Sequence, residues 1–395
     1  MKPVNFEKND YIKIVSVNKS LPTVIAFSSV NTQKGKFKPY KILLSSGINI
    51  IFVNDCGNRW YQNGIEGLSH SSEVCALELV KKAKEIGNGK VITFGTSMGA
   101  YGALLYCALG KADGCLAFGS EPELCLPGSR SEQHILKGFS HPYPKLNPVL
   151  KDNDSKIIIF SSEIDEIDLM NSYSFCINNI PNVKNIIISG MEHPSVQVFD
   201  MNNTIGDIIK NFSITLDIDS PIPRESSIPP NSSLIPKLYK SVILKKNNEN
   251  ASWLNSLEKL NLDFPKTAVV LSKLGEARLR NKDEVGAIEA WLECINISNY
   301  QFEAHAKLGA IQRRNGDYDD AYANLKKAIT INPFGAHTYH TLGLLYQNKE
   351  NFPLAEINFR KANSINPGNK PFKDSLYKFI SDDIQRKKAE INNWT

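Results

Sequence analysis

Short runs of apolar, β-favouring residues recur along the first half of the chain, and each ends in a polar or turn-forming segment. Runs of this length fit buried strands of a parallel sheet, because such strands are covered on both faces. A weaker alternation at residues 11–17 fits an edge strand. The buried strands that we predict are residues 23–27, 48–53, 91–94, 114–118, 155–160 and 183–188.

Helical periodicity lies between several of these strands. Residues 71–86 place Val74, Leu77 and Val80 at helical spacing before a capping Gly87. Further helices are expected at residues 100–108 and, after the last strand, at about 196–212. Strands that alternate with helices predict an α/β fold with a mostly parallel sheet flanked by helices, here a domain of residues 1–212.

Composition changes after residue 212. Residues 213–265 contain five prolines before residue 240 among serines, asparagines and lysines, which predicts a linker or an irregular strap. Parts of it are expected to pack as an irregular strap, because a pure linker would not contain the apolar residues Leu234, Leu238, Val242 and Leu244.

The remaining sequence repeats itself. The Leu-Gly pairs that begin at Leu274, Leu308 and Leu342 lie 34 residues apart, and a mid-repeat alanine, a bulky residue and a closing proline largely follow the same step. This is the tetratricopeptide signature, in which each repeat is a helix pair that buries its apolar face by stacking. We predict an all-α solenoid over residues 266–390, with repeats at about 268–301, 302–335 and 336–369 and a capping helix near 372–384.

One segment of the first domain carries candidate chemistry. Residues 91–102 read V-I-T-F-G-T-S-M-G-A-Y-G, so Gly95, Ser97 and Gly99 form the pattern G-x-S-x-G between a predicted strand and a predicted helix. In such a strand–turn–helix the serine takes a strained conformation, and the two glycines relieve collisions with the backbone. The pattern alone also arises by chance, so its meaning depends on its context.

This context resembles the α/β-hydrolase family over about the first half of the chain, because an acidic residue and a histidine follow the serine in the family's order. The resemblance implies Asp165 as the acid, a few residues beyond the 155–160 strand; Asp168 is the alternative, and Glu163 is a third. His193 follows the last strand directly, where the family keeps its general base.

The same resemblance suggests an oxyanion hole. The backbone N–H of Met98, at the start of the helix, is one donor, and the loop after the 23–27 strand supplies a second donor near Ser28 or Ser29. The His-Gly or Gly-Gly pair that is frequent in the family is missing from this loop.

A polar loop after the 48–53 strand contains candidates for substrate contact. Strand carboxyl ends line the ligand crevice of such sheets, so Asn54, Asp55, Trp60 and Tyr61 are candidate substrate-binding residues. In the alternative interpretation, Asn54 and Asp55 cap turns and Trp60 packs on the next helix.

Composition narrows the class of protein. The 395-residue chain is 42% hydrophobic and 22% charged with a net charge of +5, which is ordinary for a soluble globular protein and gives no reason to expect nucleic acid. Seven scattered cysteines without C-x-x-C spacing fit reduced thiols of a cytoplasmic protein. We expect no signal peptide, membrane span, metal or cofactor.

These patterns predict a serine hydrolase that cleaves an ester, joined to a tetratricopeptide module that binds a protein or peptide. The serine turn together with the W-Y-x-x-G loop resembles bacterial enzymes encoded alongside surface-glycan assembly, which would imply an acylated sugar or glycoprotein precursor as substrate. Two alternatives stay open: an O-acyltransferase with the same triad, since both reactions use one acyl-enzyme, and a binding scaffold with a silent hydrolase domain.

Overall fold

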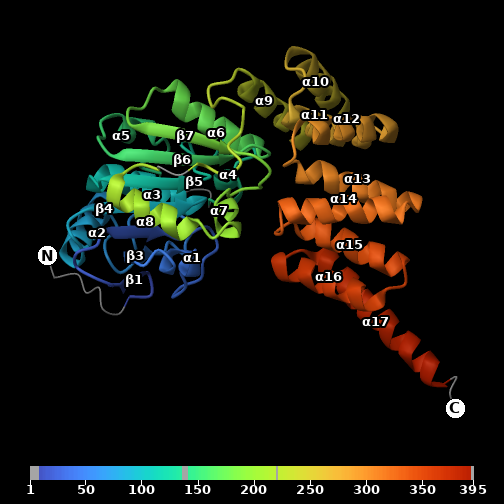
Figure 1. Ribbon diagram of the computed structural model, residues 1–395. Coiled ribbons are helices and arrows are strands. Elements are labelled where there is room, and N and C mark those ends of the chain that lie inside the picture. Colours follow the sequence, from blue (N-terminus) through green and yellow to red (C-terminus); the bar gives the residue numbers. More distant parts are fainter. Residues whose placement is uncertain (1–8, 136–140, 219–220, 393–395) are drawn as a thin grey trace. The chain divides into compact units, whose positions relative to one another are not determined.

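The computed structural model describes residues 9–135, 141–218 and 221–392 (Figure 1). The chain forms two compact units that divide between Glu249 and Asn250. The predicted strap is therefore shared between the units, because its helices α9 (Leu234–Lys246) and α10 (Asn250–Asp263) fall on opposite sides of this division.

The first unit is built on a seven-stranded sheet with the strand order β1-β3-β2-β4-β5-β6-β7. Strand β1 is an edge strand antiparallel to β3, and the other neighbours pair in parallel, so the predicted mostly parallel sheet is present. The strands are β1 (Ile12–Val15), β2 (Thr23–Phe27), β3 (Asn49–Val53), β4 (Val91–Thr96), β5 (Gly114–Phe118), β6 (Lys156–Ser162) and β7 (Val183–Ile188).

Helices cover both faces of this sheet. The connections from β2 to β3 and from β3 to β4 cross the sheet in opposite directions, so right-handed crossovers place α1 and α2 on opposite faces. Helix α2 packs against α3, and α1 packs against α8. The helices of this unit are α1 (Tyr40–Leu44), α2 (Ser72–Ile86), α3 (Met98–Gly110), α4 (Arg130–His134), α5 (Asn147–Lys151), α6 (Glu166–Ile177), α7 (Gln197–Met201), α8 (Ile205–Thr215) and α9.

The helix predicted over residues 196–212 is two helices, α7 and α8. Asn202 ends α7, and Asn203 has a φ of 54° in the left-handed region. Asparagine tolerates this conformation better than most residues, so the Asn-Asn pair turns the chain between the two helices.

Part of the predicted strap protects the edge of the sheet. The N–H of Ser226 donates to the carbonyl oxygen of Ile187 at 2.7 Å, and the N–H of Ser189 donates to that of Arg224 at 2.8 Å. These bonds pair the strap with strand β7, which would otherwise present unpaired backbone groups. Helix α9 then packs on α6.

The second unit consists of helix pairs. Helices α11 and α12, α13 and α14, and α15 and α16 pack pairwise, and α17 packs on α16 as a capping helix. The helices are α10, α11 (Ala268–Arg280), α12 (Glu284–Ile297), α13 (Phe302–Asn315), α14 (Tyr318–Ile331), α15 (Ala336–Asn348), α16 (Phe352–Ile365) and α17 (Lys370–Asn392).

The 34-residue period of the sequence corresponds to one repeated packing contact. A Cβ atom added at Gly275 would lie 2.5 Å from the Trp291 ring, and one added at Gly309 would lie 2.8 Å from Leu325. At Gly343 the distance to the Phe359 ring would also be 2.8 Å. Each glycine therefore lets the first helix of a pair lie directly against the bulky residue of the second.

Trp291→Ala should lower the free energy of unfolding of the second unit by about 3–5 kcal/mol, because it leaves a cavity where a buried ring packs on α11. It also removes the hydrogen bond from Trp291 Nε1 to the carbonyl oxygen of Ser272 at 3.0 Å. Urea unfolding of the full chain, followed by far-ultraviolet circular dichroism, measures the loss. The matched control is Leu292→Ala, one residue further at a side chain that is 46% exposed. Equal losses in the two variants would contradict this packing account.

Candidate active site

The G-x-S-x-G segment forms the sharp turn between β4 and α3. Ser97 has φ 57° and ψ −124°, a conformation that costs free energy for any residue other than glycine. A Cβ atom at Gly95 would lie 2.0 Å from the carbonyl oxygen of Gly99, and one at Gly99 would lie 2.1 Å from that of Phe27. Both glycines are therefore required for the close approach of strand, turn and helix.

Backbone hydrogen bonds fix Ser97 at the carboxyl end of the sheet. Its N–H donates to the carbonyl oxygen of Phe118 at the end of β5, at 2.8 Å. Its carbonyl oxygen accepts from the N–H groups of Ala100 and Tyr101, at 2.9 and 3.3 Å. Ser97 is only half-buried, whereas the residues on either side of it are buried, so its side chain lies at an accessible point of the turn.

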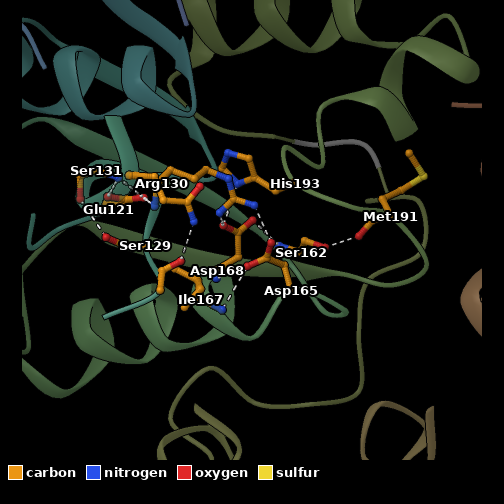
Figure 2. A network of polar contacts seen from close by, with 12 residues as sticks. Glu121, Ser129, Arg130, Ser131, Ser162, Asp165, Ile167, Asp168, Met191 and His193 are labelled. Atoms are coloured by element: carbon orange, nitrogen blue, oxygen red, sulfur yellow. Dashed lines mark hydrogen bonds and ion pairs between the residues drawn. The ribbon is translucent and has the colours of Figure 1, made fainter. Parts of the chain in front are cut away.

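A buried histidine–aspartate pair lies at the ends of neighbouring strands (Figure 2). His193 Nδ1 and Asp168 Oδ1 are 2.8 Å apart, and the two side chains are 6% and 0% exposed. The N–H of Ser162, the last residue of β6, donates to Asp168 Oδ2 at 3.2 Å. His193 Nε2 is buried and has no hydrogen-bond partner among the described residues.

Gly119 connects this pair to the serine turn. A Cβ atom added to Gly119 would lie 2.4 Å from His193 Cε1, so the imidazole rests directly on the Gly119 backbone. The preceding residue, Phe118, accepts the hydrogen bond of the Ser97 N–H. The histidine ring and the turn that holds Ser97 therefore lie against consecutive residues of one chain segment.

The structure corrects the choice of Asp165 as the partner of His193. Asp165 is the N-cap of α6, and its carboxylate accepts from the N–H groups of Ile167 and Asp168, at 3.1 and 2.9 Å. Asp168, one helical turn later, is the residue that meets the imidazole. An aspartate directly before a helix normally turns back to cap it, and this preference is the sequence signal that could have pointed to Asp168. Glu163 is engaged elsewhere and accepts from Ser226 Oγ at 3.0 Å.

Arg130 joins both aspartates, and no sequence motif predicted this role. Its Nη2 atom lies 2.5 Å from Asp165 Oδ2, and its Nη1 atom lies 3.6 Å from Asp168 Oδ1. Burial alone would raise the pKa of Asp165, but the charge of Arg130, with a further contribution from His193, outweighs burial and holds this pKa well below its ordinary value. Asp165 is therefore fully ionised at neutral pH.

The two proposed positions for the second oxyanion donor differ in the structure. The N–H of Ser28 donates to the carbonyl oxygen of Val53 at 2.9 Å, which rules out Ser28 as a backbone donor. Ser29, the next residue, is half-buried and follows the segment that packs on Gly99. Met98 is the first residue of α3, where helix geometry provides no intrahelical acceptor for its N–H. Met98 and Ser29 remain the candidate donors.

The four predicted substrate-binding residues make structural contacts. Asn54 Nδ2 donates to the carbonyl oxygens of Gln33 and Lys36, at 2.9 and 3.0 Å. Asp55 accepts from the N–H groups of Arg59 and Tyr61, at 2.7 and 3.0 Å.

The two aromatic residues of this loop are buried as well. Trp60 is 1% exposed and Tyr61 is 0% exposed, and the Tyr61 hydroxyl donates to the carbonyl oxygen of Ser28 at 2.8 Å. All four side chains are therefore buried in the loops beside the serine turn, which fits the structural alternative, and their assignment to substrate contact stays a prediction.

Comparison with known proteins identifies part of the second unit. The tetratricopeptide repeat family model matches residues 302–334 and 336–369. The second and third predicted repeats are therefore tetratricopeptide repeats, a class that typically mediates contacts between proteins. No curated protein matches the chain.

Several solved structures are similar to part of the chain. MamA from Desulfovibrio magneticus RS-1 is 19% identical over 40% of this chain and 89% of that chain, with a TM-score of 0.34. Pseudomonas aeruginosa pilF is 14% identical over 38% and 69%, with a TM-score of 0.36. The TPR domain of Arabidopsis OM64 is 20% identical over 28% and 93%, with a TM-score of 0.27.

Two further findings concern the part of the chain that the structure describes. None of its helices is long and apolar enough to cross a membrane. Its histidine, cysteine, aspartate and glutamate side chains form no group of three or more that could hold a metal ion.

Gly119→Ala should lower the free energy of unfolding of the first unit by about 2 kcal/mol more than Gly47→Ala. The two glycines have nearly equal φ values of 66° and 65°, but only a Cβ atom at Gly119 would collide with His193, whereas nothing lies within 4 Å of one at Gly47. Urea unfolding of the full chain, followed by near-ultraviolet circular dichroism, compares the variants. If both lose the same free energy, the imidazole does not rest on Gly119 as described.

Proposed function

We propose that the first unit is an α/β-hydrolase-type serine hydrolase that cleaves an ester through Ser97, His193 and Asp168. The observation that carries this proposal is the buried Asp168–His193 pair, which rests on the strand-end segment that also binds the turn of Ser97. The strained serine between a strand and a helix, and the order serine, acid, histidine along the chain, support it further.

In the proposed reaction, Ser97 Oγ attacks the ester carbonyl carbon while His193 Nε2 takes the hydroxyl proton. For this step the imidazole must carry its proton on Nδ1, and the carboxylate of Asp168 selects that tautomer by accepting at 2.8 Å. Nε2 is then the acceptor for the Ser97 proton; it has no hydrogen-bond partner among the described residues, so the serine hydroxyl would come within hydrogen-bond reach of it in the substrate complex. The same nitrogen returns the proton to the leaving alcohol, and water later releases the acyl group.

The tetrahedral intermediate carries a negative oxygen that needs donors. The N–H of Met98 at the amino end of α3 combines a donor with the positive end of the helix dipole. The N–H of Ser29 is the proposed second donor. Removal of one such donor costs about 3 kcal/mol of transition-state stabilisation in a well-studied serine protease.

Trp60 and Tyr61 belong to the loop that resembles enzymes of surface-glycan assembly, but both are buried, so this loop does not support a glycan subsite. For the second unit we propose that its repeats bind a protein or peptide partner, because two of them match the tetratricopeptide family.

Ser97→Ala should abolish covalent labelling of the purified full chain by a fluorophosphonate probe, because only an activated serine attacks the phosphorus. His193→Ala should reduce labelling by a factor of about 10³ or more, since it removes the base. Ser364→Ala, at an exposed serine of α16, is the control and should label like the wild type. Absence of labelling in folded wild-type protein would favour the silent scaffold instead.

The identity of the acid can be tested with two isosteric changes. Asp168→Asn should lower kcat/KM for p-nitrophenyl acetate by a factor of about 10⁴, because the amide favours the wrong imidazole tautomer. Asp165→Asn should lower it by less than about tenfold, because asparagine still caps α6 and Asp168 still orients the ring. Steady-state hydrolysis at the pH optimum measures both. A larger loss in Asp165→Asn would contradict the assignment of Asp168.

A further inference from the structure

Arg130 lies between two carboxylates of different roles. One arm of its guanidinium is 2.5 Å from the capping residue Asp165, and the other is 3.6 Å from Asp168 Oδ1 (Figure 2). The same Asp168 oxygen receives the His193 ring at 2.8 Å. The same Asp168 oxygen is therefore hydrogen-bonded to the imidazole and ion-paired with the guanidinium, and the positive charge of Arg130 is close to the ring.

The position of Arg130 is fixed from several sides. Its side chain is 25% exposed, which distinguishes it from a surface ion pair. The carboxylate of Glu121 accepts from the backbone N–H groups of Arg130 and Ser131, at 2.8 and 3.1 Å. These bonds hold the first turn of α4 against the segment that leaves β5. The fork of arginine suits simultaneous contact with two carboxylates, which a lysine cannot reproduce.

We propose that Arg130 is a positioning residue that fixes the Asp168 carboxylate against His193 and, together with Asp165, sets the charge that the imidazole experiences. This proposal rests on the proposed hydrolase function for its catalytic consequence, but the electrostatic arrangement itself does not depend on that function. The catalytic consequence is that the acidic limb of the pH profile of ester hydrolysis depends on Arg130.

The charges near His193 explain why both Arg130 and Asp165 lie beside the Asp168–His193 pair. Without Arg130, Asp165 and Asp168 would place two like charges close together, and both would favour protonation of His193. With Arg130 present, its charge compensates that of Asp165, and Asp168 alone contributes a net negative charge to the pair.

The charged and titratable groups near the ring come from several elements. Asp168 and Asp165 belong to α6 and its N-cap, and Arg130 belongs to α4. Glu121 lies beneath α4 and contacts the Arg130 backbone; burial raises its pKa. Glu192, next to His193 along the chain, is exposed. On the strap side, Arg224 Nη1 lies 3.8 Å from Met191 Sδ, and Arg130 is the cation that pairs with Asp168.

The test is the titration of His193 by nuclear magnetic resonance in the full chain labelled with ¹³C at histidine Cε1. The chain has seven histidines, so His193→Gln identifies the resonance. Arg130→Met should move the midpoint of this resonance's titration to higher pH, because both carboxylates are then uncompensated. Asp165→Asn should move the midpoint to lower pH, because Arg130 is then uncompensated.

Opposite shifts distinguish charge from structure, since damage to the fold would move both variants in the same direction. The double variant Arg130→Met/Asp165→Asn restores the charge balance, so the titration midpoint of the His193 resonance should lie within about 0.3 pH units of the wild-type midpoint.

Arg130→Lys keeps the charge and should shift this midpoint less than Arg130→Met does. If Arg130→Met fails to fold, Asp165→Asn decides alone, because asparagine retains the helix cap. Shifts of equal sign, or an unshifted Asp165→Asn, overturn the proposal.

Activity adds a second measurement that separates this proposal from the hydrolase function. If Ser97 is the nucleophile, the acidic midpoint of kcat/KM for p-nitrophenyl acetate should follow the His193 pKa through the same variants. If wild-type protein shows no Ser97-dependent hydrolysis, the hydrolase function fails, while the histidine titration still decides the role of Arg130. An acidic midpoint that stays fixed while the His193 pKa moves overturns the catalytic consequence.

Discussion

The first unit depends on the contact between the Ser97 turn and the ends of two neighbouring strands. Gly95 and Gly99 allow backbone to meet backbone at distances that any side chain would block. This contact places a strained serine beside β2 and β5, and the parallel strands beyond β5 bring Asp168 and His193 to the same edge of the sheet. Ser97 follows the carboxyl end of β4, Asp168 lies in the first turn of α6 after β6, and His193 lies in the loop after β7, so the order of the strands sets their relative positions.

The repeat unit also depends on glycines that allow close packing. Gly275, Gly309 and Gly343 each face a bulky side chain one helix later, so close approach again depends on residues without a Cβ atom. Here, however, the contact repeats along the chain, whereas the serine turn occurs once. The repeat unit therefore forms an extended surface from stacked helix pairs, whereas the candidate active site brings together residues that are distant along the chain.

The strands, the serine turn and the repeats could be predicted from the sequence because each is local or periodic. The apolar runs, the G-x-S-x-G spacing and the 34-residue step all lie in contiguous residues. The choice between Asp165 and Asp168 could not be settled by spacing, because both stand near the same strand end and only the helix cap separates them. The role of Arg130 was harder to predict, because its partners Asp165 and Asp168 lie 35 and 38 positions away along the chain. The burial of Trp60 and Tyr61 likewise depends on tertiary packing. It could not be predicted from the sequence, because the loop around them is polar.

The central claim is that Ser97 is a nucleophile activated by His193 and Asp168. The most direct measurement is peptide mapping by mass spectrometry of the full chain after reaction with a fluorophosphonate. The account predicts one stoichiometric adduct on the peptide that contains Ser97. An adduct confined to another serine, such as the neighbouring Ser120, or no adduct on folded protein, would contradict it.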